Sequence, residues 1–186
     1  MAWTSKYAAK FTEPVADQMV AIVKRDIVAA LAWASGGATP PLQPFVEYDL
    51  ALLPVANFPA LLVAPQQESF DDESEQTRHQ TLRLFVSLAI TNQDRNRLAR
   101  DIQVYVRAVD AILNSSWELS VQDFYATNLP LPSPPYGSGS LSPGLPAGSL
   151  MRVFVEGHGY DEMRRTATSA FAMAATLAVI VELEET

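Results

Sequence analysis

The clearest pattern in the chain is the alternation of apolar residues with polar or small ones at positions 81–90. Side chains two positions apart lie on the same face of a β-strand, so one face of this segment is expected to be apolar. The apolar face carries five large residues: Leu82, Leu84, Val86, Leu88 and Ile90. The alternation predicts a half-buried strand.

Two further segments, residues 14–34 and 95–114, have the apolar spacing of one face of an α-helix. Thr12 is a candidate N-cap of the first helix, and Gly36-Gly37 is a stop signal after it. Its charged residues Lys24, Arg25 and Asp26 are expected on the solvated side. The apolar sets are Val15, Met19, Ile22, Val23, Ile27, Ala30 and Leu31 in the first helix, and Leu98, Ile102, Tyr105, Val109, Ile112 and Leu113 in the second.

The second helix follows a polar turn at residues 91–96, where either Asn92 or Asp94 is available as the cap. Its outer face is expected to hold charged residues. These are Arg97, Arg100, Asp101, Arg107 and Asp110. Both helices are therefore expected to bury one side and leave the other in contact with solvent or with a partner.

The remaining extended segments are shorter or more ambiguous. Residues 45–53 and 58–64 are expected to be extended, and Pro59 and Pro65 bound the second of these. Residues 150–156 are predicted to be a strand, followed by a turn region at 157–165. Residues 171–183 alternate large and small side chains and predict a long final strand, with a helix over 167–178 as the rival interpretation. The small residues Ala172, Ala174, Thr176 and Ala178 would let a helix or another subunit approach the other face closely.

A long segment at about 115–149 separates these elements. A short strand is possible at 117–125, but residues 126–149 carry no charge and contain 15 Pro, Gly or Ser among 24 residues. Such a composition predicts a loop. About 37 residues follow it, too few for a second core. We therefore expect one domain over residues 1–186, with its core in 14–114 and 150–184 and a loop insertion between them. The fold class is α+β: an antiparallel or mixed sheet of four to five strands packed on two amphipathic helices.

Composition narrows the classes of function. The 186-residue chain has no cysteine, which excludes disulfides and thiolate metal sites, and its formal charge of −8 argues against a non-specific nucleic-acid binder. Its longest apolar stretch, residues 171–181, is too short to span a membrane, and no secretory signal is visible at the N-terminus. No membrane partner is expected.

No reaction centre is recognisable. His79 and His158 lie in separate segments, and His158 between two glycines is most simply a turn residue rather than a metal ligand. There is no nucleophile elbow, phosphate-binding loop or dinucleotide fingerprint. We therefore expect a protein that is not an enzyme and needs neither cofactor nor metal.

Two charged groups are the candidate functional residues. The segment 66–76 is acidic, lacks the spacing of a calcium loop and is expected to be a solvated loop and a candidate interface. Its residues are Glu68, Asp71, Asp72, Glu73 and Glu75. Four arginines around the second helix are candidates for contacts between subunits: Arg95, Arg97, Arg100 and Arg107.

Taken in this order, the elements resemble the tail terminator, or tail completion, proteins of tailed bacteriophages. The resemblance is carried by Phe-Pro-Ala-Leu-Leu-Val-Ala-Pro at 58–65, by the strand 82–90 leading through Thr91-Asn92-Gln93-Asp94 into the helix 95–113, and by the closing strand 170–184. It covers roughly residues 14–114 and 150–184. The loop at 115–149 is longer than the pattern of that family.

The resemblance implies a structural virion protein of the tail or neck, assembled in the host cytoplasm. Such proteins form homohexameric rings that cap the tail tube and meet the head connector or neck protein, while DNA only passes through the lumen. In such a ring the acidic segment 66–76 would suit the lumen, because it would repel passing DNA. The resemblance implies no catalytic residues. Two alternatives stay open: another head–tail connector or tail-like particle component, and a small-molecule-binding or enzymatic α+β domain whose site is assembled from scattered residues.

Overall fold

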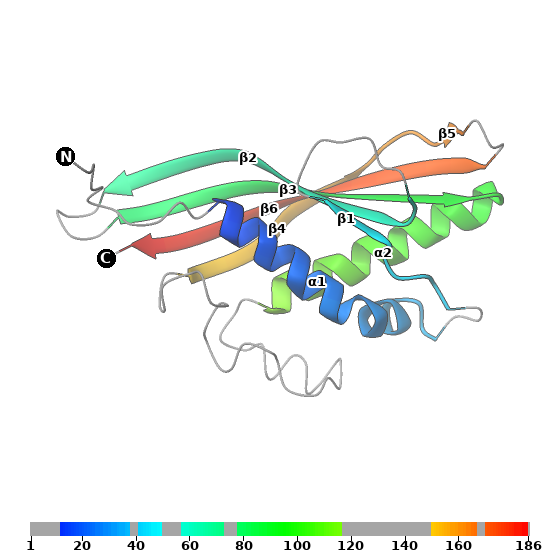
Figure 1. Ribbon diagram of the computed structural model, residues 1–186, viewed down its shortest axis with the longest axis horizontal. Helices are drawn as coiled ribbons and strands as arrows, with labels where there is room; N and C mark the ends of the chain where they lie inside the picture. Colours follow the sequence, from blue (N-terminus) through cyan, green and yellow to red (C-terminus); the bar gives the residue numbers. More distant parts are fainter. Residues whose placement is uncertain are drawn as a thin grey trace.

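The computed structural model describes residues 12–37, 41–49, 57–72, 78–116, 150–166 and 170–185. Two helices, α1 (Thr12–Ala34) and α2 (Arg95–Ser116), pack on one face of a six-stranded sheet (Figure 1). The α+β class expected from the sequence is confirmed. The predicted strand at 117–125, the loop at 126–149 and residues 50–53 lie outside the described residues.

The sheet is mixed but mostly antiparallel, with the strand order β1-β2-β3-β6-β4 and β5 paired to β6. The strands are β1 (Glu47–Asp49), β2 (Ala60–Asp72), β3 (Arg78–Asn92), β4 (Leu150–Tyr160), β5 (Arg164–Arg165) and β6 (Phe171–Glu185). Only β1, which pairs with the start of β2, is parallel to its neighbour. The central pair β3 and β6 is in register over its full length, from Arg78 opposite Glu185 to Asn92 opposite Phe171.

One hydrophobic core lies between the sheet and the helices. The five apolar residues predicted to share one face of β3 are all buried, as are the predicted apolar sets of both helices. On β6 the buried residues Ala175, Leu177, Val179 and Val181 alternate with half-buried ones, and Ile180 is the one buried residue outside this alternation among those described. The strand interpretation of 171–183 is therefore confirmed over the rival helix.

Local signals define the ends of both helices. At the end of α1, Gly36 and Gly37 have φ values of 66° and 75°, a conformation that suits glycine. The amide of Gly37 donates to the carbonyl of Ala32 at 3.0 Å. At the start of α2, Asp94 Oδ1 accepts hydrogen bonds from the amides of Asn96 (2.8 Å) and Arg97 (3.2 Å), so Asp94 is the cap.

One residue of α1 departs from the predicted solvated side. Asp26 is fully buried, and its carboxylate is paired with the guanidinium of Arg25. The position lies four residues from both Ile22 and Ala30, which places it on the buried face. The opposite charge of Arg25 compensates the carboxylate, as a buried charge requires. Lys24 is exposed as predicted, with its amine 5.6 Å from the centroid of the Tyr48 ring.

Two predicted loops are strands. β2 does not end at Pro65 but continues to Asp72, and β4 runs through Gly157, His158 and Gly159 to Tyr160. Proline is tolerated on an edge strand or at a bulge, and the register of β2 shifts between Pro65 and Gln67. The register of β4 shifts in the same way between Val155 and Gly157, and such a bulge accommodates glycine within a strand. In both strands, pairing with a long neighbour outweighs the local composition.

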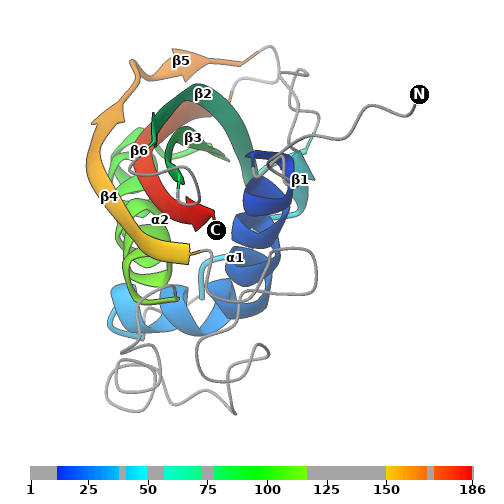
Figure 2. The same cartoon turned by 90° about the vertical axis from the view of Figure 1, so that its left-hand side faces the viewer.

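The sheet extends beyond the helices at one end. In Figure 1 the tip of β2 lies well past the start of α1, and the first residues of β3 run between it and the last residues of β6. We call this part the arm: residues 66–72 of β2 with the paired residues 78–83 of β3 and 180–185 of β6. Figure 2, turned by 90°, shows the strong twist and curvature of the sheet from this end.

Candidate assembly surfaces

The acidic residues predicted to lie in a loop are carried instead by the arm. Glu68 and Asp71 are exposed in β2, opposite Leu82 and His79 of β3, and Asp72 is the last residue of the strand. Glu73 and Glu75 lie outside the described residues. Every residue from Pro65 to Asp71 is exposed. The acidic side chains are thus held on a strand, with their spacing fixed by the sheet, and their role in a lumen or an interface stays a prediction.

The four arginines of the second helix do not form one group. Arg95, Arg97 and Arg100 are exposed in the first two turns of α2, and Arg97 Nε lies 3.6 Å from the carboxylate of Asp101. Arg107 lies further along the helix, with its guanidinium 4.7 Å from the ring centroid of Trp33 in α1. This cation–π contact joins the two helices. Arg107 and Arg97 thus have contacts within the chain, and the role of all four arginines in contact with a partner stays a prediction.

Two further arginines lie at the same end of the molecule as Arg95, Arg97 and Arg100, which no pattern in the sequence indicated. Arg164 and Arg165 form β5 and are both exposed. Arg165 pairs with Phe171 of β6, and Phe171 also pairs with Asn92 at the end of β3, three residues before α2 begins. The pairing of β6 with both segments brings these arginines to the end of the sheet where α2 starts. In the sequence they are two adjacent cations in a predicted turn.

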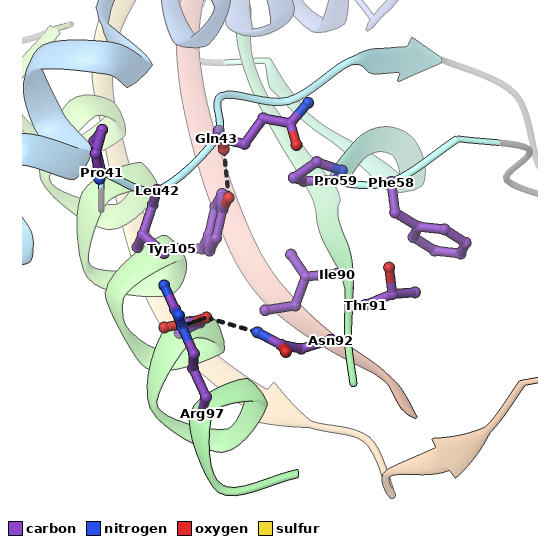
Figure 3. Close-up of a pocket in the computed structure, with 11 residues that line it drawn as sticks. Pro41, Leu42, Gln43, Phe58, Pro59, Ile90, Thr91, Asn92, Arg97 and Tyr105 are labelled. Atoms are coloured by element: carbon purple, nitrogen blue, oxygen red, sulfur yellow. Dashed lines mark hydrogen bonds and ion pairs between the residues drawn. The ribbon is translucent and has the colours of Figure 1, made fainter. Parts of the chain in front are cut away.

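A polar cavity of about 270 Å³ lies at this end of the molecule, where α2, β3 and the segment 41–43 meet (Figure 3). The Tyr105 hydroxyl donates to the carbonyl of Gln43, and Asn92 Nδ2 donates to Asp101 Oδ2 at 3.3 Å. Arg97 lies beside the same carboxylate. Small-molecule sites are commonly roughly 300 to 1,000 Å³ and mainly apolar. This cavity is smaller and polar, and its hydrogen bonds tie α2 to its neighbours.

The electrostatics of the cavity follow from partial burial. Burial raises the pKa of Asp101 above its ordinary value, with a smaller contribution from Asp94, while Arg97 and the hydrogen bond from Asn92 lower it. Burial, followed by the charge of Asp101, also raises the pKa of the Tyr105 hydroxyl, which therefore stays protonated and keeps donating to Gln43 at neutral pH.

The other face of the sheet carries the small residues predicted to allow close approach. Ala89 of β3 and Ala172 and Ala174 of β6 line a second cavity of about 220 Å³, together with Phe58, Asp161, Glu162, Arg164 and Met173. The two described helices pack on the opposite face. The expectation that another subunit lies against the small residues stays a prediction.

His158 is not a turn residue as the sequence suggested but an exposed strand residue of β4. Its ring meets that of Tyr160 edge to face, with centroids 5.5 Å apart. In the part of the chain that the structure describes, no three His, Asp or Glu side chains gather as a metal site would require. None of the described helices is long and apolar enough to cross a membrane.

Comparison with known proteins gives a match in structure alone. No protein-family model matches the sequence, and no curated protein does. Among solved structures, the fold is similar to a chain in the virion of a native gene transfer agent particle, with a TM-score of 0.52 and 14% identity. The match covers 95% of this chain and 99% of that one. At this identity the likeness shows a shared fold.

Proposed function

We propose that this chain is a structural component of a phage-like virion and acts without catalysing a reaction. The observation that carries the proposal is the fold match to a chain of a gene transfer agent virion, which spans nearly the whole of both chains. The charged ends of the molecule, exposed on ordered elements, support a role in assembly.

Within the virion, we propose the role of a tail terminator: a homohexameric ring at the neck that caps the tail tube and joins it to the head connector, with DNA passing through its lumen. The resemblance of 58–65, 82–113 and 170–184 to that family supports this role. A contact between two different surfaces of identical subunits can be repeated around an axis, and it closes a ring when the rotation between copies allows. The chain would assemble in the host cytoplasm and remain in the particle.

The test is to remove the chain from an assembling particle and to examine the products by electron microscopy. If the chain caps the tube, tubes without it are expected to exceed their normal length and heads to remain unattached. Supplying the wild-type chain in trans should restore tails of normal length. Tails of normal length without attached heads would instead assign the chain to the connector class, and intact particles would contradict a structural role.

A further inference from the structure

Strand β2 leaves one edge of the sheet open at the arm. Its pairing with β1 covers only Ala60, Leu61 and Leu62, and no other described strand pairs with that side from Val63 to Ser69. Unpaired N–H and C=O groups along a strand edge are a template for another chain. At the opposite edge, β4 is tied to α2 at one position, where the side chain of Asn114 accepts a hydrogen bond from the amide of Val155 at 2.9 Å.

The open edge belongs to an acidic end of the molecule. Glu68 and Asp71 are exposed on β2, and the sheet register places three further acidic residues on the neighbouring end of β6: Glu182, Glu184 and Glu185. Against these acidic residues, the arm contains two arginines: Arg78, which lies opposite both Asp72 and Glu185, and Arg83. Negative charge therefore dominates the arm.

The other end of the molecule is rich in arginine. Five exposed arginines lie there: Arg95, Arg97 and Arg100 of α2 and Arg164 and Arg165 of β5. Within the described residues, only Arg97 of these five forms an ion pair. Asp161 and Glu162 lie at the same end, and the carboxylate of Asp94 is used as the helix cap. We call the surface that carries these five arginines the arginine end.

The acidic edge and the arginine end cannot meet within one chain. They lie at opposite ends of β3, which has 15 residues, and a strand rises about 3.3 Å per residue, so they are roughly 45 Å apart. Each copy thus carries both halves of a complementary pair. Complementary charge favours one orientation of docking over others and disfavours like-with-like contact.

We propose that the open acidic edge of β2 in one copy docks against the arginine end of a second copy. This inference rests on the proposed function, since it names the contact that repeats in the assembly. Of the two roles that the sequence allowed for Glu68 and Asp71, it selects the interface rather than the lumen. The contact joins two different surfaces, so its repetition closes a ring when the rotation between copies allows.

Cysteine cross-linking tests the contact directly, because the natural chain contains no cysteine. The variant Asp71→Cys/Arg165→Cys is expected to form a covalent ladder beyond the dimer under mild oxidation. Either single substitution can give at most a dimer. The matched control Asp71→Cys/Gln103→Cys pairs the arm with an exposed residue further along α2 and should form no ladder. The absence of the first ladder, or an equal ladder in the control, overturns the proposal.

Charge reversal tests the chemistry of the same contact. Glu68→Lys/Asp71→Lys and Arg164→Glu/Arg165→Glu should each weaken self-association in sedimentation about tenfold or more, with unchanged circular dichroism. Self-association should return in the chain with all four substitutions and in an equimolar mixture of the two double variants. Failure of both rescues, or self-association that the double variants leave unchanged, overturns the contact. Loss of binding to a DNA duplex in the arginine variant alone, with self-association unchanged, would assign that end to nucleic acid.

These outcomes are separable from those of the proposed function. A chain that self-associates through these surfaces but is absent from particles keeps the contact and loses the virion role. A chain that is present in particles, but in which the paired cysteines never cross-link there, keeps the virion role and loses the contact.

Discussion

At the scale of single residues, one polar link connects α2 to the edge of the sheet. Asn114 accepts a hydrogen bond from the Val155 amide and donates one from Nδ2 to Asp110 Oδ1, both at 2.9 Å. The link satisfies a backbone donor of an edge strand that has no further strand beside it among the described residues. Burial raises the pKa of Asp110 above its ordinary value, while the charge of His158 and the hydrogen bond from Asn114 lower it.

The raised pKa of Asp110 predicts how stability depends on pH. The carboxyl group of Asp110 holds its proton more tightly in the folded state than in the unfolded chain. The free energy of unfolding therefore falls as the pH rises from the ordinary pKa of 3.8 through the pKa of the folded state. Asp110→Asn has no such proton and still offers an acceptor to Asn114. We expect the variant to gain stability over the wild type at pH 7 but not at pH 3, as measured by urea unfolding. An equal difference at both pH values would contradict this account.

At the scale of elements, the start of α2 is defined by two short polar side chains. Asn92 Oδ1 accepts from the amide of Asp94 at 3.0 Å, and Asp94 in turn accepts from the first amides of the helix. The negative charge also lies at the positive end of the helix dipole. This start positions Arg95, Arg97 and Arg100, so the cap supports the geometry of the arginine end.

Removal of the cap should therefore weaken both stability and the proposed contact. Asp94→Ala is expected to lower the free energy of unfolding by about 1 kcal/mol. The neighbouring exposed Gln93→Ala is the control and should stay within about 0.5 kcal/mol of the wild type. Urea unfolding of the two variants measures the difference. Equal stabilities would show that solvent replaces the Asp94 hydrogen bonds without cost.

The elements also show which structure the sequence could predict. Both helices and strands β3 and β6 have one buried face, and the apolar residues of that face recur at regular spacing in the sequence. The outer half of β2 and the segment 157–160 of β4 have no such face to mark them, because Pro65 to Asp71 and His158 to Tyr160 are exposed. Their strand conformation comes from pairing with residues far away in the sequence, which no local pattern records. The prediction that Asp26 lies on the solvated side was wrong because it followed the charge of the residue rather than its position in the helical repeat.

At the scale of the whole molecule, the candidate surfaces depend on distances that a sequence does not contain. The acidic residues of β2 and the arginines of α2 were both visible as charged groups. That they occupy opposite ends, and that Arg164 and Arg165 join the second group, follows only from the register of β6 with β3, β4 and β5. The pairing of the strands thus places the acidic residues and the arginines at opposite ends of the molecule.

The continuity of β3 and β6 predicts that the arm and the body unfold together. Leu82 is fully buried in β3 where the arm meets the body, opposite Val181 of β6. Leu82→Ala leaves a cavity there and is expected to cost about 2–5 kcal/mol. Because no strand of the central pair is interrupted at that point, amide hydrogen exchange should quicken to the same extent in residues 78–83 and 86–90.

Arg83→Ala is the matched control, since Arg83 is the next residue on the other face. Its side chain is 46% exposed, and its guanidinium lies 3.6 Å from the 49% exposed Glu156. An exposed pair of this kind contributes at most about 1 kcal/mol. If Leu82→Ala quickened exchange in the arm alone, the arm would be a separately unfolding unit. Docking of the β2 edge would then have to offset the entropy of ordering the arm. The proposed contact between two copies would be weaker than its charges alone suggest.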